Sequence, residues 1–275
     1  MLLENQFGER SCALPADYFE RSSPARVWDY WLGGENNYPV DRAVGDEYIR
    51  VYPEVLTIAR ASRQLLSRVV RHLAGPAGIR NFLDIGAGLP TVQNTHEVAQ
   101  AVAPDSRVVY VDNDPLVLAH ARTLLTNTTP EGITVCLDVD VHEPELIISD
   151  ARNTLNFNQP VAVLLLGILG HAASTAGEMH RITKRLMAAS PPGSYLVVGD
   201  GVRTGDRRFE TAARNRGYHL RTMEEFRACF DGLELIEPGV VPCNLWRPER
   251  FEIGIGAGTV VEPLVSYVGV GRKPA

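Results

Sequence analysis

Cysteine is scarce in this sequence, and its cysteines show no functional spacing. There are four, Cys12, Cys136, Cys229 and Cys243, and none forms a Cys-x-x-Cys pair or lies near a histidine at the spacing of metal ligands. We therefore expect neither a structural metal site nor a disulfide framework. A reducing, cytoplasmic location fits this pattern.

Long hydrophobic runs are also absent. The longest, Val161–Leu169, is far shorter than the stretch of about 20 apolar residues that a membrane-spanning helix needs. The first residues, Met-Leu-Leu-Glu-Asn-Gln, show no basic region followed by an apolar one, so we expect no signal peptide. The sequence therefore predicts a protein without a membrane partner.

The chain has no excess of positive charge. Its net charge is −6 at pH 7, whereas a standing nucleic-acid partner requires a basic face that meets the phosphates. We therefore expect no such partner. Five arginines could form a local basic patch, although a solvated helix face is the simpler interpretation. They are Arg203, Arg207, Arg208, Arg214 and Arg216.

From Ile79 onward, short apolar segments alternate with amphipathic helices. This alternation predicts an α/β fold with a doubly wound, mostly parallel sheet covered on both faces. We predict seven strands, of which the last two form an antiparallel hairpin at one edge. The predicted strands are Asn81–Ile85, Arg107–Val111, Ile133–Leu137, Val161–Leu166, Tyr195–Val198, Leu233–Ile236 and Leu264–Val270.

The residues before the first strand have a helical pattern. Helices are predicted over Pro24–Leu32, Asp41–Val51 and Glu54–Leu73, the last with apolar residues three or four positions apart. Together these segments predict a helical extension over residues 1–74. Residues 75–275 then form the sheet-containing core.

The first strand runs into a glycine turn. In the stretch Asn81–Thr91, Gly86 and Gly88 follow the strand, and Asp84 lies near its carboxyl end. Glycine has no Cβ, so the backbone of such a turn can approach a ligand closely. Ligands of doubly wound sheets bind beyond the carboxyl ends of the strands, which predicts a nucleotide-like cofactor at this turn.

The turn distinguishes between two adenosine-containing cofactors. A dinucleotide site requires Gly-x-Gly-x-x-Gly, but Thr91 occupies the third position and Pro90 removes a backbone N–H. Asp84 would repel a pyrophosphate and attract an ammonium group. S-adenosyl-L-methionine carries an α-amino group and a sulfonium, both positive, and no phosphate. It is therefore the predicted cofactor.

Further polar residues follow the next strands. Asp112 follows the second strand, where an acidic side chain accepts hydrogen bonds from the ribose hydroxyls, and Asp140 follows the third, where a carboxylate could accept from the adenine amino group. Asn113 and Gly167 lie at the same edge. Each aspartate alone could be a helix cap or a turn residue, but three acids at successive strand ends favour a cofactor site.

Four segments carry a resemblance to a known family: Phe-Leu-Asp-Ile-Gly-Ala-Gly-Leu-Pro-Thr at 82–91, His-Glu-Val-Ala-Gln at 96–100, Val-Val-Tyr-Val-Asp-Asn-Asp-Pro at 108–115 and Ser-Pro-Ala-Arg-Val-Trp-Asp-Tyr-Trp-Leu-Gly-Gly-Glu-Asn-Asn-Tyr-Pro at 23–39. They resemble actinobacterial S-adenosylmethionine-dependent methyltransferases of unassigned substrate, over nearly the whole chain. The resemblance implies the class I methyltransferase fold, which is Rossmann-like. The cofactor acids of that class fall on Asp84, Asp112 and Asp140, with Gly86 and Gly88 as the turn. Pro90 departs from the class, in which a third glycine is common.

The catalytic residues are less evident. Methyl transfer requires a general base only if the acceptor is protonated. His171, just after the fourth strand, is a weak candidate, because it could instead be a hydrogen-bonded residue at a loop-to-helix junction. Asp200 could face the acceptor or cap the next helix, and His142 is expected to be structural. The acceptor is expected to be a small molecule, and the oligomeric state is left open.

The helical extension is predicted to fold over the cofactor as a lid. Asn37 and Tyr38 lie in a loop, where polar and aromatic residues often bind ligands, so we expect them to touch the ligand. Tyr30 and Trp31 share the apolar face of the first helix and are expected to serve packing.

Two other functions fit the sequence. The first is a regulatory or degenerate protein that binds S-adenosylmethionine or S-adenosylhomocysteine without transferring a methyl group. The second is an NAD-dependent oxidoreductase, which predicts NADH binding that survives an Asp84→Asn substitution.

Overall fold

The structure is a computed structural model that describes residues 17–124, 126–249 and 262–275. Residues 1–16, where the predicted helical extension begins and where Cys12 occurs, lie outside the described residues. So does residue 125, near the end of a predicted helix.

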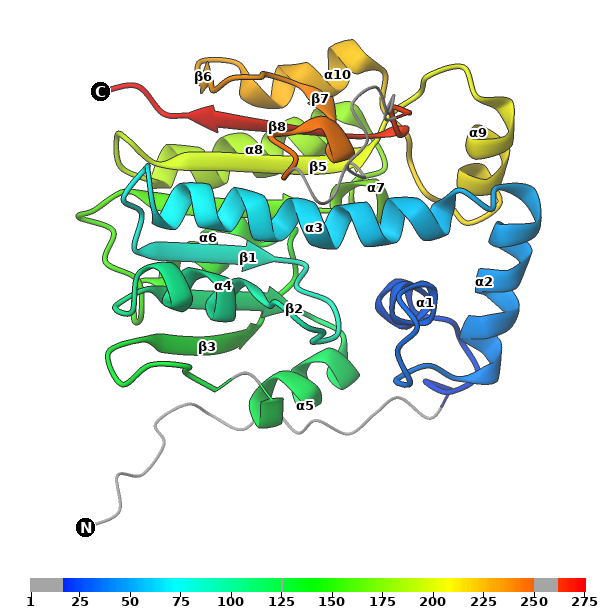
Figure 1. The fold of residues 1–275 in the computed structure, drawn as a ribbon, viewed down its shortest axis with the longest axis horizontal. Coiled ribbons are helices and arrows are strands. Elements are labelled where there is room, and N and C mark those ends of the chain that lie inside the picture. Colours follow the sequence, from blue (N-terminus) through cyan, green and yellow to red (C-terminus); the bar gives the residue numbers. More distant parts are fainter. Residues whose placement is uncertain (1–16, 125, 250–261) are drawn as a thin grey trace.

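A sheet of eight strands forms the centre of the molecule (Figure 1). The strands are β1 (Asn81–Ile85), β2 (Arg107–Asp112), β3 (Ile133–Asp138), β4 (Val161–Leu166), β5 (Tyr195–Gly201), β6 (Glu234–Leu235), β7 (Val241–Pro242) and β8 (Ser266–Arg272). Their order is β3-β2-β1-β4-β5-β8-β6, and β7 pairs with β8 off this path.

Strand directions confirm the predicted sheet. β1 to β5 pair in parallel, and β8 runs antiparallel to both β5 and β6. The seven strands of the main path correspond to the seven predicted. The eighth, β7, escaped prediction because two residues carry no periodicity.

Ten α-helices occur among the described residues: α1 (Pro24–Trp31), α2 (Pro39–Val51), α3 (Val55–Ala74), α4 (Thr95–Val102), α5 (Pro115–Leu124), α6 (Pro144–Ala151), α7 (Leu169–Ala172), α8 (Ala176–Ala189), α9 (Arg207–Arg214) and α10 (Met223–Arg227). Short 3₁₀ turns cover Ala228–Phe230 and Cys243–Leu245. α4 begins at Thr95, because Asn94 caps it in a capping box with Glu97 and the preceding residues form a loop.

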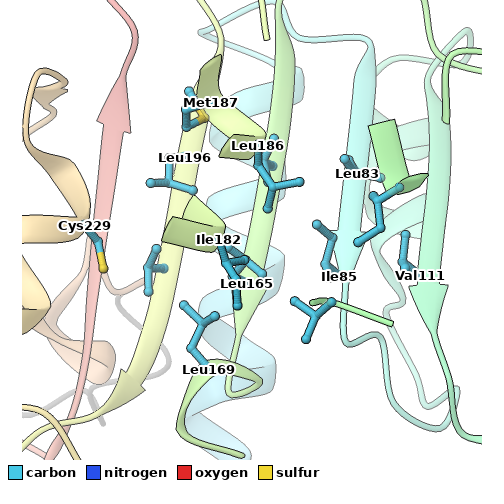
Figure 2. Close-up of a cluster of buried hydrophobic side chains, with 14 of the residues drawn as sticks. Leu83, Ile85, Val111, Leu165, Leu169, Ile182, Leu186, Met187, Leu196 and Cys229 are labelled. Atoms are coloured by element: carbon cyan, nitrogen blue, oxygen red, sulfur yellow. The ribbon is translucent and has the colours of Figure 1, made fainter. Parts of the chain in front are cut away.

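Successive strand residues pack into opposite layers. In β1, Leu83 and Ile85 join the cluster beneath α6 and α8, which Figure 2 shows in close-up. Phe82 joins the opposite cluster, beneath α3 and α4. Because side chains alternate along a strand, burial on both faces explains the continuous apolar strands of the sequence.

A third cluster connects the N-terminal helices to the sheet. It contains residues of α1, α2, the first turns of α3, and α9. The rest of α3 belongs to the cluster on the sheet face. In Figure 1, α1, α2 and α9 lie beyond the carboxyl ends of the parallel strands. The helices before β1 thus stand over the edge of the sheet where ligands are expected.

Within the described residues, no helix combines the length and the apolar character needed to cross a membrane.

Candidate functional site

The glycine turn after β1 is tied to the end of β2. Gly86 and Gly88 have φ values of 75° and 65°, a region that favours glycine. The Gly86 N–H donates to the Val111 carbonyl at 2.8 Å, and the Gly88 N–H donates to Asp112 Oδ2 at 3.0 Å. A Cβ at Gly88 would meet no atom within 4 Å. The turn is therefore held from one side and open on the other.

Asp84 lies beneath this turn and is only 5% exposed. Its Oδ2 accepts a hydrogen bond of 2.6 Å from the hydroxyl of Thr95, the first residue of α4. Burial raises the pKa of Asp84 to about 6, against the opposing effects of the Thr95 hydrogen bond and the positive charge of Arg63. At neutral pH most Asp84 side chains are ionised, so this buried carboxylate can receive a cation.

Arg63 of α3 was not predicted as a site residue. Its Nη2 donates to the carbonyls of Val92 and Gln93 at 3.1 and 3.2 Å. Its Nε is buried without a hydrogen-bond partner among the described residues. The positive charge of Arg63 and the negative charge of Asp84 act on each other beside the glycine turn. The sequence contains no local signal for this pair, because Arg63 belongs to α3 and Asp84 to β1, and the two residues are far apart in the chain.

The ends of β2 and β3 are linked by side chains. Asn113 Nδ2 donates to Asp140 Oδ2 at 2.8 Å, and His142 Nδ1 lies 2.5 Å from Asp140 Oδ1. Burial acts to raise the pKa of Asp140, but the contacts with His142 and Asn113 lower it overall. The contact with Asp140 raises the pKa of His142, and its Nε2 lies 3.0 Å from the Ala172 carbonyl. His142 thus connects the loop after β3 to α7.

Asp112 is mainly engaged with backbone groups. Besides the Gly88 N–H, its carboxylate accepts the Asp114 N–H at 3.0 Å. Burial raises its pKa, although these two hydrogen bonds act in the opposite direction. Asp84, Asp112, Asn113 and Asp140 therefore lie at neighbouring strand ends, β1 to β3, as the sequence predicted.

The N-terminal helices are fastened to the same edge. The Tyr18 hydroxyl donates to Asp114 Oδ1 at 2.5 Å, and the Ser23 hydroxyl donates to Asp114 Oδ2 at 2.6 Å. Behind them, Arg26 Nε lies 2.9 Å from Asp41 Oδ2 in an ion pair whose side chains are 1% and 0% exposed. This buried ion pair fixes α1 against α2, and Asp114 fixes both to the loop after β2.

Asn37 and Tyr38 lie among these contacts of the N-terminal helices. Asn37 Nδ2 donates to Asp29 Oδ2 and to the Gly34 carbonyl, and its Oδ1 accepts from Arg42 Nη1 at 2.9 Å. Tyr38 precedes α2, and its ring packs against Phe19. Neither residue lines the cavity that lies between these helices and the sheet. Ligand contact by Asn37 and Tyr38 therefore stays a prediction.

That cavity, of about 340 Å³, lies between the N-terminal helices and the ends of β4 and β5. Its wall is mostly apolar and comes from α1, α2, α3 and α9: Val27, Trp28, Trp31, Val44, Tyr48, Val55, Ile58, Leu65 and Phe209. Trp31, expected to serve packing, contacts Tyr48 with ring centroids 5.1 Å apart and also lines the cavity.

One end of the cavity is polar. Gly167, His171, Asp200 and Tyr218 meet there. Gly167 has a φ of 81°, and a Cβ at this position would meet no atom within 4 Å. The His171 ring packs edge-on against the Tyr218 ring, with the ring centroids 4.7 Å apart. Burial, with the nearby charge of His219, lowers the pKa of His171 to about 4. His171 is therefore neutral at pH 7.

Asp200 is the acid of this polar end and is 3% exposed. Its Oδ2 accepts the Gly170 N–H at 2.7 Å, and its Oδ1 accepts the Gly201 N–H at 3.0 Å. Burial raises its pKa to about 7, because these two hydrogen bonds and the charge of Arg221 offset only part of the desolvation. Asp200 thus titrates near neutral pH in the cavity wall, and its hydrogen bond to Gly170 lies in the first turn of α7. It does not cap the next helix, α9, which Asp206 caps.

The described residues contain no group of three His, Cys, Asp or Glu side chains placed to hold a metal ion. Together, the strand-end acids, the glycine turn and the neighbouring cavity can accommodate a cofactor with a cationic end beside a second, apolar molecule.

Comparisons with known proteins identify the family of the chain. Residues 17–274 match the model of a family described as S-adenosyl methyltransferase. A DUF574 family protein of Streptomyces avermitilis is 40% identical, with 93% of this chain and 99% of that one covered and a TM-score of 0.86. A protein of Thermobifida fusca YX, provisionally named a methyltransferase, is 40% identical, with 95% and 98% covered and a TM-score of 0.85.

No curated protein matches the chain. The family match leaves no support for the NAD-dependent alternative, because the family uses S-adenosylmethionine. It also confirms the resemblance to actinobacterial methyltransferases that the sequence carries. The chain belongs to the S-adenosyl methyltransferase family, DUF574, and is an S-adenosylmethionine-dependent methyltransferase.

Proposed function

We propose that this methyltransferase acts on a small molecule with a largely apolar body, which it binds in the cavity beneath α1 and α2. The observation that carries this proposal is the cavity itself. It has the size of a small-molecule site, an apolar wall and a few convergent polar groups at one end. In this proposal α1 and α2 serve as a lid over the acceptor cavity, whereas the sequence predicted that the extension over residues 1–74 covers the cofactor.

The residues at the strand ends fit the cofactor. Asp84 is a buried carboxylate that would hold the ammonium group, and the unpartnered Nε of Arg63 beside it suits the carboxylate. We assign Asp112 to the ribose and Asp140 with Asn113 to the adenine. Gly86, Gly88 and Gly167 would lie along the cofactor. The space beyond Gly88 and Gly167 supports this assignment, because no protein atom fills it.

When bound, S-adenosylmethionine supplies a methyl group that its sulfonium already activates. The chain then has to orient the acceptor and exclude water. The aromatic wall of Trp28, Trp31 and Tyr48 suits both tasks, since it is apolar and closes the cavity on the side of the lid.

Two side chains could handle a proton of the acceptor. A general base works best with a pKa near the working pH. Asp200, with a pKa of about 7, is therefore a stronger base than His171, whose pKa is about 4. We assign proton acceptance to Asp200. The neutral His171, the catalytic candidate of the sequence, would orient the acceptor through a hydrogen bond.

We further propose a cytoplasmic location. The three described cysteines, Cys136, Cys229 and Cys243, are free, and free thiols suit a reducing compartment.

The experiment that tests the acceptor site is a pair of tryptophan substitutions in α2. Val44 lines the cavity, whereas its neighbour Ala43 is exposed. In a pool of small molecules supplied with S-adenosylmethionine labelled in its methyl group, Val44→Trp should lower transfer at least about tenfold. Ala43→Trp should leave it unchanged, and calorimetry should show equal cofactor binding by both variants. Equal transfer by both variants would place the acceptor outside this cavity.

A further inference from the structure

A second pocket, of about 340 Å³, lies next to the acceptor cavity and has the opposite chemistry. Arg203, Arg214 and Arg221 line it together with His219 and Ser174, and Glu210 is the one acid among the described residues that line it. The Tyr218 side chain lines both the pocket and the cavity and thus stands between them. Methyl transfer, as proposed above, makes no use of these arginines.

The backbone holds these arginines together. Val202 and Arg221 form a parallel β-bridge, and the Arg203 N–H donates to the Arg221 carbonyl at 2.8 Å. Arg214 comes from α9, one helical turn after Glu210, so both side chains lie on the same face of that helix. The pocket is therefore formed by two hydrogen-bonded backbone segments, around Arg203 and Arg221, and by the helix α9.

The arginines of this pocket differ from their neighbours in having no acidic partner. Arg208 lies 2.7 Å from Glu54, and Arg216 lies 3.4 Å from Glu47. In the part of the chain that the structure describes, no carboxylate lies within 4.0 Å of a nitrogen of Arg203, Arg214 or Arg221. Of the five arginines noted in the sequence, Arg208 and Arg216 thus pair with acids of the N-terminal helices, Arg203 and Arg214 face the pocket, and among the described residues Arg207 does neither.

Arg221 gives the clearest indication of a ligand. It is 6% exposed, and its Nη atoms donate to backbone carbonyls, including that of His219 at 2.9 Å. Its Nε is buried without a hydrogen-bond partner among the described residues. The charge of Asp200 offsets part of the charge of Arg221, but a buried N–H without an acceptor is costly, and an oxyanion supplies the missing acceptor.

We infer that this pocket binds the carboxylate or phosphate group of a small molecule. Arg203 and Arg214 contact the oxyanion from the open side, and Arg221 neutralises it from below. The anion is either a separate ligand or the far end of an acceptor whose body occupies the neighbouring cavity. Both sources present the same chemistry to the arginines.

Direct binding of inorganic phosphate tests the site, whether or not methyl transfer is observed. Calorimetry at low ionic strength should show saturable binding by the wild-type protein. The double variant Arg203→Gln/Arg214→Gln should bind phosphate at least about tenfold more weakly, because it loses two charged donors. Arg207→Gln is the matched control, since Arg207 is exposed on the same helix and does not line the pocket. Absence of saturable binding, or an equal loss in the control, would overturn the inference.

A second measurement distinguishes the two sources of the anion. Labelled methyl transfer into a metabolite pool separated by anion exchange is compared for the wild type and the double variant. A loss confined to anionic products shows that the group belongs to the acceptor. Unchanged products together with weakened phosphate binding show a separate anion.

Discussion

The two regions at the carboxyl edge of the sheet have opposite character. At the ends of β1, β2 and β3 the acids are each surrounded by donors: Thr95 for Asp84, backbone N–H groups for Asp112, and Asn113 with His142 for Asp140. At the ends of β4 and β5 the surroundings are mostly apolar, and Asp200 is the one acid among the described residues of the cavity wall.

In our proposal, the first region binds the cofactor tightly and the second supports methyl transfer. A region rich in fixed polar partners suits a charged, polar cofactor, because its hydrogen-bonding groups are already oriented. An apolar cavity excludes water and shifts the pKa of an isolated acid towards the working pH. Substitutions in the two regions should therefore affect different measurements, one the affinity for the cofactor and the other the rate of transfer.

The largest effect is expected from Asp200→Asn. If Asp200 accepts the acceptor's proton, the variant should transfer methyl groups about 10²–10⁴-fold more slowly and still bind the cofactor. In the wild type, transfer should rise with pH through about 7 as Asp200 ionises, and then level off. Initial rates between pH 5.5 and 8.5 measure this profile, and the variant should not show it.

The matched control for this prediction is Asp206→Asn. Asp206 caps α9 outside the cavity, and asparagine is an equally good cap. A wild-type rate that does not change across pH 7 would rule out Asp200 as the base, even if the variant were too unstable to assay. An active Asp200→Asn variant with the wild-type profile would do so as well.

A smaller effect, on affinity alone, is expected from Asp84→Asn. Loss of a charged acceptor should weaken binding of S-adenosylmethionine and S-adenosylhomocysteine by about 10- to 100-fold, as measured by calorimetry. Arg63→Met should weaken binding of S-adenosylhomocysteine but not of methylthioadenosine, which lacks the amino-acid part. Asp138→Asn, an exposed acid at the end of β3, serves as control. Equal affinities for wild type and Asp84→Asn would remove Asp84 from the cofactor site.

The two regions also differ in what the sequence reveals. Asp84, Gly86 and Gly88 are adjacent in the chain, and Asp112 and Asp140 follow strands whose apolar runs are plain. The parallel order of β1 to β3 was therefore enough to predict that they lie together. The sheet, its antiparallel edge and the helices before it were predictable for the same reason, because each depends on a local pattern.

The cavity could not be predicted in this way. Its wall combines residues from Ser22 to Ser266, and no local pattern specifies that Trp28, His171 and Tyr218 share one space. Asn37 shows a second limit of what can be predicted from a sequence, this time for a local pattern. Its loop position suggested ligand contact, whereas its amide is engaged with Asp29, Gly34 and Arg42. Only tertiary packing distinguishes a polar residue that binds a ligand from one that fastens a loop.

The smallest expected effect concerns the contact between the two regions. Tyr18 and Ser23, on the lid side, both donate to Asp114, which follows β2 on the cofactor side. Each of these hydrogen bonds is worth about 1 kcal/mol, so Tyr18→Phe should speed local opening of α1 about fivefold. Hydrogen exchange of the α1 amides measures this rate. Tyr195→Phe is the control, because Tyr195 begins β5, at the edge of the sheet opposite α1.

If the lid closes over both regions, cofactor binding should slow exchange in α1 of the wild type and should slow it less in Tyr18→Phe. Asp114 is two residues from Asp112, the residue proposed to hold the ribose, so a bound cofactor orders the acceptor of the Tyr18 hydrogen bond. Exchange in α1 that does not respond to the cofactor in either protein would show that the two regions work independently. The helices before β1 would then cover the acceptor without sensing the cofactor.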